Sequence, residues 1–137
     1  ILLPRKEVKK MDTFIHYALS AGTEALRDSG LEVTDDNAER IGVHIGSGMG
    51  GLPMIQEGIK NLITRGPRKI TPFFVPATIA NMASGNLSIM HGLKGPNVSI
   101  VTACATGTHS IGDAGRLIAY GDADVMVTGG TEAATSP

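Results

Sequence analysis

The sequence predicts a single α/β domain built around a parallel sheet. Its 137 residues fall within the range expected for one domain. The spacing of apolar residues changes along the chain in the order helix, strand, helix, helix, strand, helix, strand, which is typical of α/β proteins. Short connections join the last strand, helix and strand, and this arrangement predicts a right-handed parallel crossover.

The first predicted element is an amphipathic helix over residues 5–29, because apolar residues recur there at helical spacing. Gly30 would end this helix, since glycine adopts the left-handed conformation that follows a helix C-terminus. A buried strand is expected at residues 41–45 and leads into a glycine-rich loop, residues 46–51. A weaker helix is expected to follow over residues 52–63.

The middle of the chain contains two proline-rich segments, residues 66–69 and 72–76, which we interpret as loops. Each proline lacks a backbone donor and moves the residue before it away from the helical conformation. A further helix is predicted over residues 78–90, with Gly92 as its stop signal.

The last third of the chain predicts a short β-branched strand at residues 98–101, a helix over 106–120 closed by Gly121, and a strand at 124–128. One apolar stripe of the helix is expected to face the core and holds Ile111, Ala114, Leu117 and Ile118. Three glycines in the same helix each cost about 1 kcal/mol relative to alanine, so they predict a closely packed neighbour. These are Gly107, Gly112 and Gly115.

Composition and charge exclude several classes of protein. With 12 basic and 13 acidic residues the formal net charge is −1, which argues against a nucleic-acid-binding surface. No stretch approaches the roughly 20 apolar residues of a membrane span. The single cysteine, Cys104, cannot form an internal disulfide, and no secretory signal precedes the first helix. We therefore expect a cytoplasmic protein.

The ends of the chain predict that it is a piece of a longer protein. It begins at Ile1 without a methionine, and it stops at Pro137 directly after a glycine-rich strand end.

Cys104 is the strongest candidate for chemistry because it lies where a buried strand gives way to a helix. Free amide groups and the positive end of the helix dipole favour a thiolate at such a position and can bind an oxyanion formed beside it. These properties suit a nucleophile for acyl transfer. Taken on placement alone, the alternative is a small buried apolar residue, which is the usual role of a lone cysteine.

Several sequence motifs surround Cys104 and precede it along the chain. The segment around the cysteine is TACATG, at residues 102–107, and it is followed by HSIGDA, IAYGDADVMV and GGTE at residues 109–114, 118–127 and 129–132. Upstream lie IGSGMGG, GPRKI and PFFVP at residues 45–51, 66–70 and 72–76. Together these motifs resemble those of the β-ketoacyl-acyl carrier protein synthases, in particular the type II elongating enzymes. The resemblance covers nearly the whole chain, and the cysteine itself is present.

This resemblance implies a thiolase-like layered α/β/α/β/α fold, of which residues 1–137 form a partial N-terminal ketosynthase domain, most of the first of two related halves. It implies that Cys104 takes an acyl group from acyl carrier protein and that its own N–H helps to bind the oxyanion. Decarboxylation of malonyl carrier protein then supplies the carbanion that lengthens the chain by two carbons. The histidine pair, the lysine and the second oxyanion donor of the family are expected beyond Pro137. No cofactor is implied.

The resemblance also assigns roles to other residues. Met49, Phe74 and Thr78 match positions that line the acyl pocket, the last two reaching the pocket of a partner subunit; core packing is the alternative for all three. Lys6, Lys9, Lys10, Arg68 and Lys69 match basic positions that receive acidic acyl carrier protein, for which a solvated surface is the alternative. The segment 97–101 resembles the strand that pairs across the dimer axis, so a homodimer is expected.

No metal site is expected. His16, His44, His91 and His109 lack ligand spacing with one another, with Cys104 or with carboxylates. For His109, five residues after the cysteine, packing or capping is preferred to catalysis. The glycine-rich loop lacks the pattern of a nucleotide-binding loop, so a close-packed turn is the better interpretation.

Three functional hypotheses follow. The first is an elongating type II synthase, and the second is an enzyme of the same fold, either a type I synthase or a polyketide ketosynthase. The third treats the isolated chain as a dimerisation and docking module without turnover.

Overall fold

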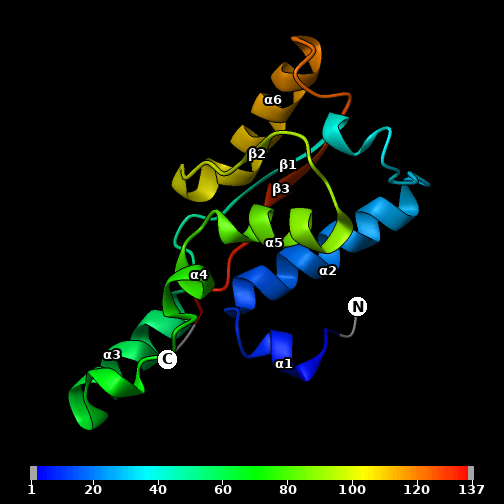
Figure 1. The fold of residues 1–137 in the computed structure, drawn as a ribbon. Helices are drawn as coiled ribbons and strands as arrows, with labels where there is room; N and C mark the ends of the chain where they lie inside the picture. Colours follow the sequence, from blue (N-terminus) through cyan, green and yellow to red (C-terminus); the bar gives the residue numbers. More distant parts are fainter. Residues whose placement is uncertain (1–2, 136–137) are drawn as a thin grey trace.

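The computed structural model describes residues 3–135 and contains a three-stranded sheet with helices on both faces (Figure 1). Strand β1 (Ile41–Gly46) is central, and both β2 (Asn97–Val98) and β3 (Val125–Gly130) run parallel to it. Between β2 and β3 the chain passes through α6 (Thr106–Ala119) and crosses over β1. The predicted α/β class and the parallel crossover are therefore confirmed.

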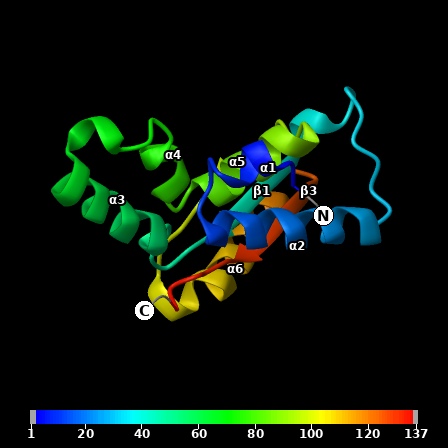
Figure 2. The same ribbon diagram turned by 90° about the horizontal axis from the view of Figure 1, so that it is seen from below.

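The helices divide into two layers and a projecting arm. Helices α2 (Thr13–Asp28) and α5 (Met82–His91) cover one face of the sheet, and α6 covers the other. Helices α3 (Leu52–Arg65) and α4 (Phe74–Thr78) extend away from the sheet, as both views show (Figures 1 and 2). The smaller elements are α1 (Arg5–Val8) and the 3-10 helices η1 (Ala38–Arg40), η2 (Pro67–Lys69) and η3 (Ala103–Ala105).

The core lies between β1 and the layer formed by α2 and α5. All six residues of β1 are buried, which fits a central parallel strand covered on both faces. Phe14 and Leu19 of α2 and Leu87 of α5 are fully buried in this core. A Cβ atom on Gly22 would lie 2.5 Å from Leu87 Cδ2, so this glycine allows α2 and α5 to approach closely.

The single helix predicted over residues 5–29 is wrong, because Asp12 separates it into α1 and α2. Asp12 has an extended backbone, and its carboxylate accepts a hydrogen bond from the N–H of Thr13 at the start of α2. Its second oxygen accepts the N–H of Met54 in the first turn of α3, at 2.8 Å. One buried carboxylate therefore satisfies free donors of two helix N-termini. The end of the helix at Gly30 is as predicted.

The proline-rich segments and the helix after them also differ from the prediction. Residues 67–69 form η2, and residues 74–78 form α4 instead of a loop. Pro76 is tolerated because it occupies the first turn of α4, where the backbone N–H has no partner within the helix. The next helix begins at Met82 instead of residue 78, because Ile79 is extended and separates α4 from α5.

The strand predicted at residues 98–101 is much shorter, since β2 ends at Val98. The buried hydroxyl of Ser84 takes the place of the missing strand residues. It accepts the N–H of Ile45 at 2.8 Å and lies 2.9 Å from the carbonyl of Ile45 and 2.8 Å from that of Val98. Because a side chain holds the edge of β1 there, residues 99–101 leave the sheet toward the turn that carries Cys104.

The remaining elements agree closely with the prediction. The strand expected at 41–45 gains one residue, the helix expected at 52–63 ends at Arg65, and the last strand is shifted to Val125–Gly130. The helix expected at 106–120 is α6, but the residues of its predicted apolar stripe do not all face the core. Ala114 is buried against the sheet, whereas Ile111 and Ile118 are exposed among the described residues.

The three glycines of α6 also behave differently from one another. Gly107 has a close neighbour, the backbone of Gly130, as predicted. A Cβ atom on Gly112 or Gly115 would meet no described atom within 4 Å, so the close neighbour predicted for these two is absent from the described chain. Within residues 3–135, no helix combines the length and the apolar character needed to cross a membrane.

Candidate active site

Cys104 lies in the turn that joins the end of the sheet to α6, at the centre of η3. Ala103, directly before it, has a φ of +51°, the only positive value among the described non-glycine residues. Such a conformation is strained in a residue with a Cβ atom, typically by about 1–3 kcal/mol. The strained turn leaves Cys104 exposed, which excludes the alternative of a buried apolar cysteine within the described chain.

The turn is held in place by Thr106, the first residue of α6. The buried Thr106 Oγ1 accepts the N–H of Thr102 at 2.9 Å, which closes a loop around Cys104. The N–H of Ala105 is used by the carbonyl of Thr102, whereas the N–H of Cys104 has no partner among the described residues. This amide is therefore free to bind an oxyanion formed beside the sulfur.

Glycines bring the strand ends close to this turn. A Cβ atom on Gly46, at the end of β1, would lie 2.3 Å from the carbonyl oxygen of Ile100 and 2.4 Å from Thr106 Cγ2. A Cβ atom on Gly130, at the end of β3, would lie 2.9 Å from Gly107 Cα. Only glycine fits at these two strand ends, because backbone occupies the space of a side chain.

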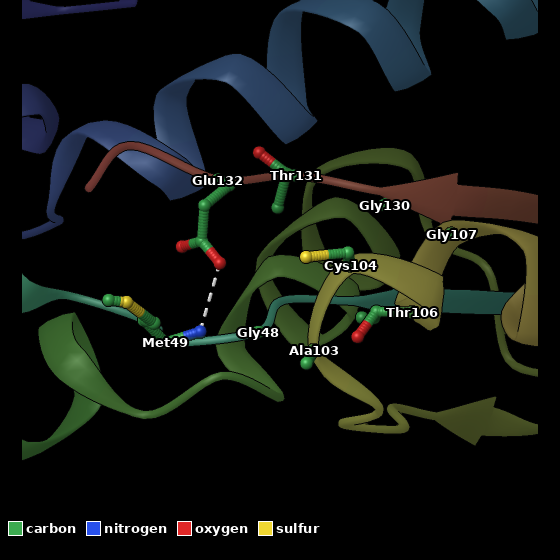
Figure 3. A pocket seen from close by; sticks show the side chains of 10 residues that line it. Gly48, Met49, Ala103, Cys104, Thr106, Gly107, Gly130, Thr131 and Glu132 are labelled. Atoms are coloured by element: carbon green, nitrogen blue, oxygen red, sulfur yellow. Dashed lines mark hydrogen bonds between the residues drawn. The ribbon is translucent and has the colours of Figure 1, made fainter. Parts of the chain in front are cut away.

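These elements enclose a pocket of about 510 Å³ into which the Cys104 sulfur points (Figure 3). The pocket lies at the carboxyl ends of β1 and β3, the edge at which parallel α/β sheets bind their ligands. Its lining is formed by Gly46, Gly48, Met49, Ala103, Cys104, Thr106, Gly107, Gly130, Thr131 and Glu132. The lining is mainly apolar, with Glu132 as its one charged side chain among the described residues.

Glu132 is a pocket residue that sequence reasoning missed. It follows β3, and its carboxylate accepts the N–H of Met49 at 2.9 Å (Figure 3). The same carboxylate also accepts the hydroxyl of Ser47 at 3.1 Å. The sequence signal was present, since GGTE belongs to the motifs quoted above, but a single glutamate after a strand does not indicate which loop it will reach.

The candidate acyl-pocket residues occupy two places. Met49 lines the pocket with Cys104. Phe74 and Thr78 lie on α4, outside this pocket. The ring of Phe74 packs against Gly58 of α3, and the buried Thr78 hydroxyl is 2.9 Å from the carbonyl of Phe74. The glycine-rich loop connects the two places, because the N–H of Gly51 donates to the carbonyl of Thr78 at 2.9 Å.

The five candidate docking residues come from two segments. Lys6 and Lys9 are exposed at α1, and Arg68 and Lys69 are exposed on η2. Lys10 follows α1, and its Nζ atom lies 2.7 Å from Glu7 Oε1 and 5.4 Å from the centre of the ring of Phe73, four residues beyond Lys69. We call these five residues, Lys6, Lys9, Lys10, Arg68 and Lys69, the basic surface.

None of the histidines lines the Cys104 pocket. His16 Nε2 lies 3.0 Å from the carbonyl of Val8, and His91 Nε2 lies 2.6 Å from Thr23 Oγ1. His44 and His109 both face Asp113, at 3.9 and 3.6 Å. Burial lowers the pKa of both His44 and His91, for His44 against the opposing attraction of Asp113. Among residues 3–135, no group of three or more His, Cys, Asp or Glu side chains is arranged to hold a metal ion.

The sequence around this site matches a known protein family. The family described as "Beta-ketoacyl synthase, N-terminal domain" matches residues 2–137. The chain belongs to the β-ketoacyl synthase family. Its fold is accordingly that of part of a thiolase-like ketosynthase, on the N-terminal side of the enzyme.

Individual β-ketoacyl synthases agree with this assignment. The chain is 62% identical to the 3-oxoacyl-[acyl-carrier-protein] synthase 2 of Vibrio cholerae serotype O1, over 98% of this chain and 33% of the relative. It is 54% identical to the synthase of the same name from Coxiella burnetii, over 100% of this chain and 33% of that relative. The chain therefore spans about a third of the length of the curated relatives it matches.

A solved ketosynthase has the same backbone arrangement. The structure that contains it is described as a type II PKS acyl-carrier protein in complex with its ketosynthase bound to the hexaketide. The TM-score is 0.88 at 28% sequence identity, and the match covers 98% of this chain and 39% of that chain.

Proposed function

We propose that this chain supplies the nucleophilic part of a 3-oxoacyl-[acyl-carrier-protein] synthase of the type II elongating kind, which acts in fatty acid biosynthesis. The observation that carries the proposal is the placement of Cys104. An exposed cysteine, held by a strained turn at the start of α6, points into an apolar pocket in a chain of this family. The names of the relatives support the elongating reaction.

In the proposed reaction, the Cys104 thiolate attacks the thioester carbonyl of an acyl carrier protein. A carbon–sulfur bond to Cys104 forms, and the bond to the phosphopantetheine sulfur breaks, so that this thiol leaves. The free N–H of Cys104 is one donor to the oxyanion of the intermediate. Malonyl carrier protein then loses carbon dioxide, its carbanion attacks the acyl group, and the Cys104 thiolate is released as the carbon–carbon bond forms.

The proposal assigns the acyl tail to Met49, Phe74 and Thr78. Met49 lies in the same pocket as Cys104, and its flexible apolar side chain suits a tail of variable length. Phe74 and Thr78 lie on the projecting arm of α3 and α4, and we propose that they line the pocket of a second subunit in a homodimer. The exposed apolar side chains of the arm support that arrangement, among them Ile59, Leu62, Ile63 and Val75.

The proposed partner is an acyl carrier protein, which is acidic in this family and would meet the basic surface. The solved complex described above joins a ketosynthase to its acyl carrier protein, which supports this assignment. The proposal also includes a cytoplasmic location, the expectation drawn from the single cysteine of the sequence.

The closest alternative is a polyketide ketosynthase, and the structural match to a type II polyketide enzyme is the observation that favours it. Against it stands the higher identity to synthase 2 relatives, 62% compared with 28%.

The proposal is tested by trapping the acyl-enzyme. The complete gene product is mixed with acyl carrier protein loaded with a fatty acyl chain, and intact mass is measured. We expect one acyl adduct on the wild type and none on Cys104→Ala, because the alanine provides no nucleophile. Thr108→Ala, an exposed change on the same helix, is the matched control and should acylate normally. An acyl adduct on Cys104→Ala would show that Cys104 is not the nucleophile.

A further inference from the structure

The glycine-rich loop is fastened to β3 by one side chain. Besides the two hydrogen bonds that Glu132 accepts from Met49 and Ser47, a third connects the network to the next residue of the loop, since the N–H of Gly50 donates to Ser47 Oγ at 3.0 Å. Ser47 is buried, with 1% of its surface exposed. The Glu132 carboxylate therefore holds the backbone of this loop both directly and through Ser47.

The loop has a further hydrogen bond to the segment that follows β3, from the N–H of Thr131 to the carbonyl of its first residue, Gly46, at 3.0 Å. It contains four glycines among its six residues, and Gly50 has a φ of +69°, so the backbone itself is easily deformed. A Cβ atom on Gly48 would lie 2.9 Å from Glu132 Oε2 and 3.4 Å from the carbonyl oxygen of Ala103. The loop thus passes between the Glu132 carboxylate and the Cys104 turn.

A negative charge in this pocket requires an explanation. A carboxylate repels a nucleophilic thiolate that shares its pocket and an oxyanion that forms there, and both effects oppose the proposed reaction. The hydrogen bonds of Glu132 point instead to the loop. Its effect on the site is to fix the one pocket residue whose backbone it contacts, Met49.

We propose that Glu132 is a positioning residue that fixes the backbone of Met49 and thereby sets which fatty acyl chain lengths the pocket accepts. This inference rests on the proposed function. With the carboxylate in place, the Met49 side chain is held at one position in the pocket. Without it, the loop moves relative to Cys104, and the discrimination between short and long acyl tails changes while the cysteine turn, held by Thr106, keeps its geometry.

The test compares hexanoyl and tetradecanoyl carrier proteins as acyl donors to the complete gene product. The rate of Cys104 acylation is followed by intact mass for the wild type, Glu132→Ala, Glu132→Gln and Ser47→Ala. We expect the ratio of the two rates to change about tenfold in Glu132→Ala, because a small misplacement of a positioning group costs that much or more. Glu132→Gln should change it less, since its amide oxygen still accepts the Met49 N–H. Ser47→Ala should act in the same direction.

The control is Glu39→Gln, which removes a charge from an exposed side chain at the opposite end of β1 and should leave the ratio unchanged. Alkylation of Cys104 by iodoacetamide is measured on every variant. Ser47→Ala, which keeps the Glu132 charge, should keep the wild-type rate, whereas the Glu132 variants should react at least as fast because a repelling charge is removed. That charge effect applies to both acyl donors alike and leaves the ratio of their rates unchanged. An equal loss of both acylation rates, or an unchanged ratio in both Glu132 variants, would overturn the inference. Failure of the proposed function is seen separately, as a wild type that forms no acyl adduct with either donor.

Discussion

At the scale of single residues, the site depends on small side chains in unusual places. Ala103 has a positive φ in the turn that carries Cys104. Gly46 and Gly130 allow the ends of β1 and β3 to approach this turn closely. Glu132 then reaches across to Met49. Each of these residues looks ordinary in the sequence, and its role follows only from what the fold places beside it.

His44 is one of two histidines, with His91, whose pKa is lowered by burial, and it defines a pH dependence. Its side chain is buried in β1, and its Nδ1 atom has no hydrogen-bond partner among the described residues. Two titratable groups on α6 face it, Asp113 at 3.9 Å and His109, which shares the same carboxylate. Burial is the larger effect and lowers the pKa of His44, so the neutral imidazole is favoured in the folded state.

The first prediction concerns stability against pH. Unfolded histidine titrates near pH 6.5, about its ordinary value, whereas folded His44 resists protonation, so the unfolded state binds more protons below that pH. The stabilisation is complete above about pH 6.5 and declines as the pH falls toward the lowered pKa. Thermal unfolding measured at neutral and mildly acidic pH should therefore show a smaller acid-induced decrease in Tm for His44→Gln than for the wild type. An equal decrease in both would contradict it.

At the scale of elements, the basic surface comes from two segments that are far apart in sequence, one at α1 and one at η2. Lys10, two residues after α1, contacts the ring of Phe73, which lies four residues beyond Lys69. Exposed charges of this kind contribute little to folding stability. They act mainly on the encounter with an acidic partner, which they steer and hold through contacts that salt screens.

The second prediction is a charge reversal on η2. Changing Arg68 and Lys69 to Glu should raise the Michaelis constant for carrier-bound substrates several-fold, because it places like charges opposite an acidic carrier protein. Short pantetheine thioesters lack the carrier protein, so their Michaelis constant should stay within about twofold of the wild type. Steady-state kinetics with both substrate kinds, at two salt concentrations, measures this. Equal losses on both would indicate structural damage instead of docking.

Most elements could be predicted from the sequence because their apolar spacing is regular, as in β1, α3, α6 and β3. Two of the boundaries that were wrong have a common physical cause. Asp12 divides the first helix and Ser84 ends β2, and both act through side-chain hydrogen bonds to residues distant in sequence. Periodicity carries no information about such partners. For the site, the motifs pointed to Cys104 and Met49, which lie in one pocket of the structure, but the reach of Glu132 depends on β1 and β3 being neighbours.

At the scale of the whole molecule, the described residues provide a nucleophile without the groups needed to stabilise a carbanion. No histidine or lysine of residues 3–135 lines the Cys104 pocket. The outer face of α6 exposes Ile111 and Ile118, with Gly115 between them meeting no described atom within 4 Å of its Cβ position. An apolar helix face with glycine at its centre is suited to close packing by another segment.

The third prediction follows for the 137-residue polypeptide made alone. It should form no 3-oxoacyl product from acyl and malonyl carrier proteins, because preorganised electrostatic groups normally supply the largest part of such catalysis. It should also self-associate in sedimentation experiments through its exposed apolar face. Coexpression with the remaining two-thirds of the Vibrio cholerae relative is the control and should reduce the association. Measurable product, or a well-behaved monomer, would contradict the corresponding part.

The carboxylate of Asp12 has a consequence for how the molecule opens. Helix α3 contains no buried residue, so the projecting arm has little apolar attachment to the rest of the chain. Its attachment includes the bond from Met54 to Asp12, which spans 42 residues, and the bonds of Thr78 and Ala77 to Gly51 and Asp12. Such a region undergoes local unfolding as a unit, at lower free energy than the sheet. Amide hydrogen exchange in α3 thus reports on Asp12, a residue outside the arm.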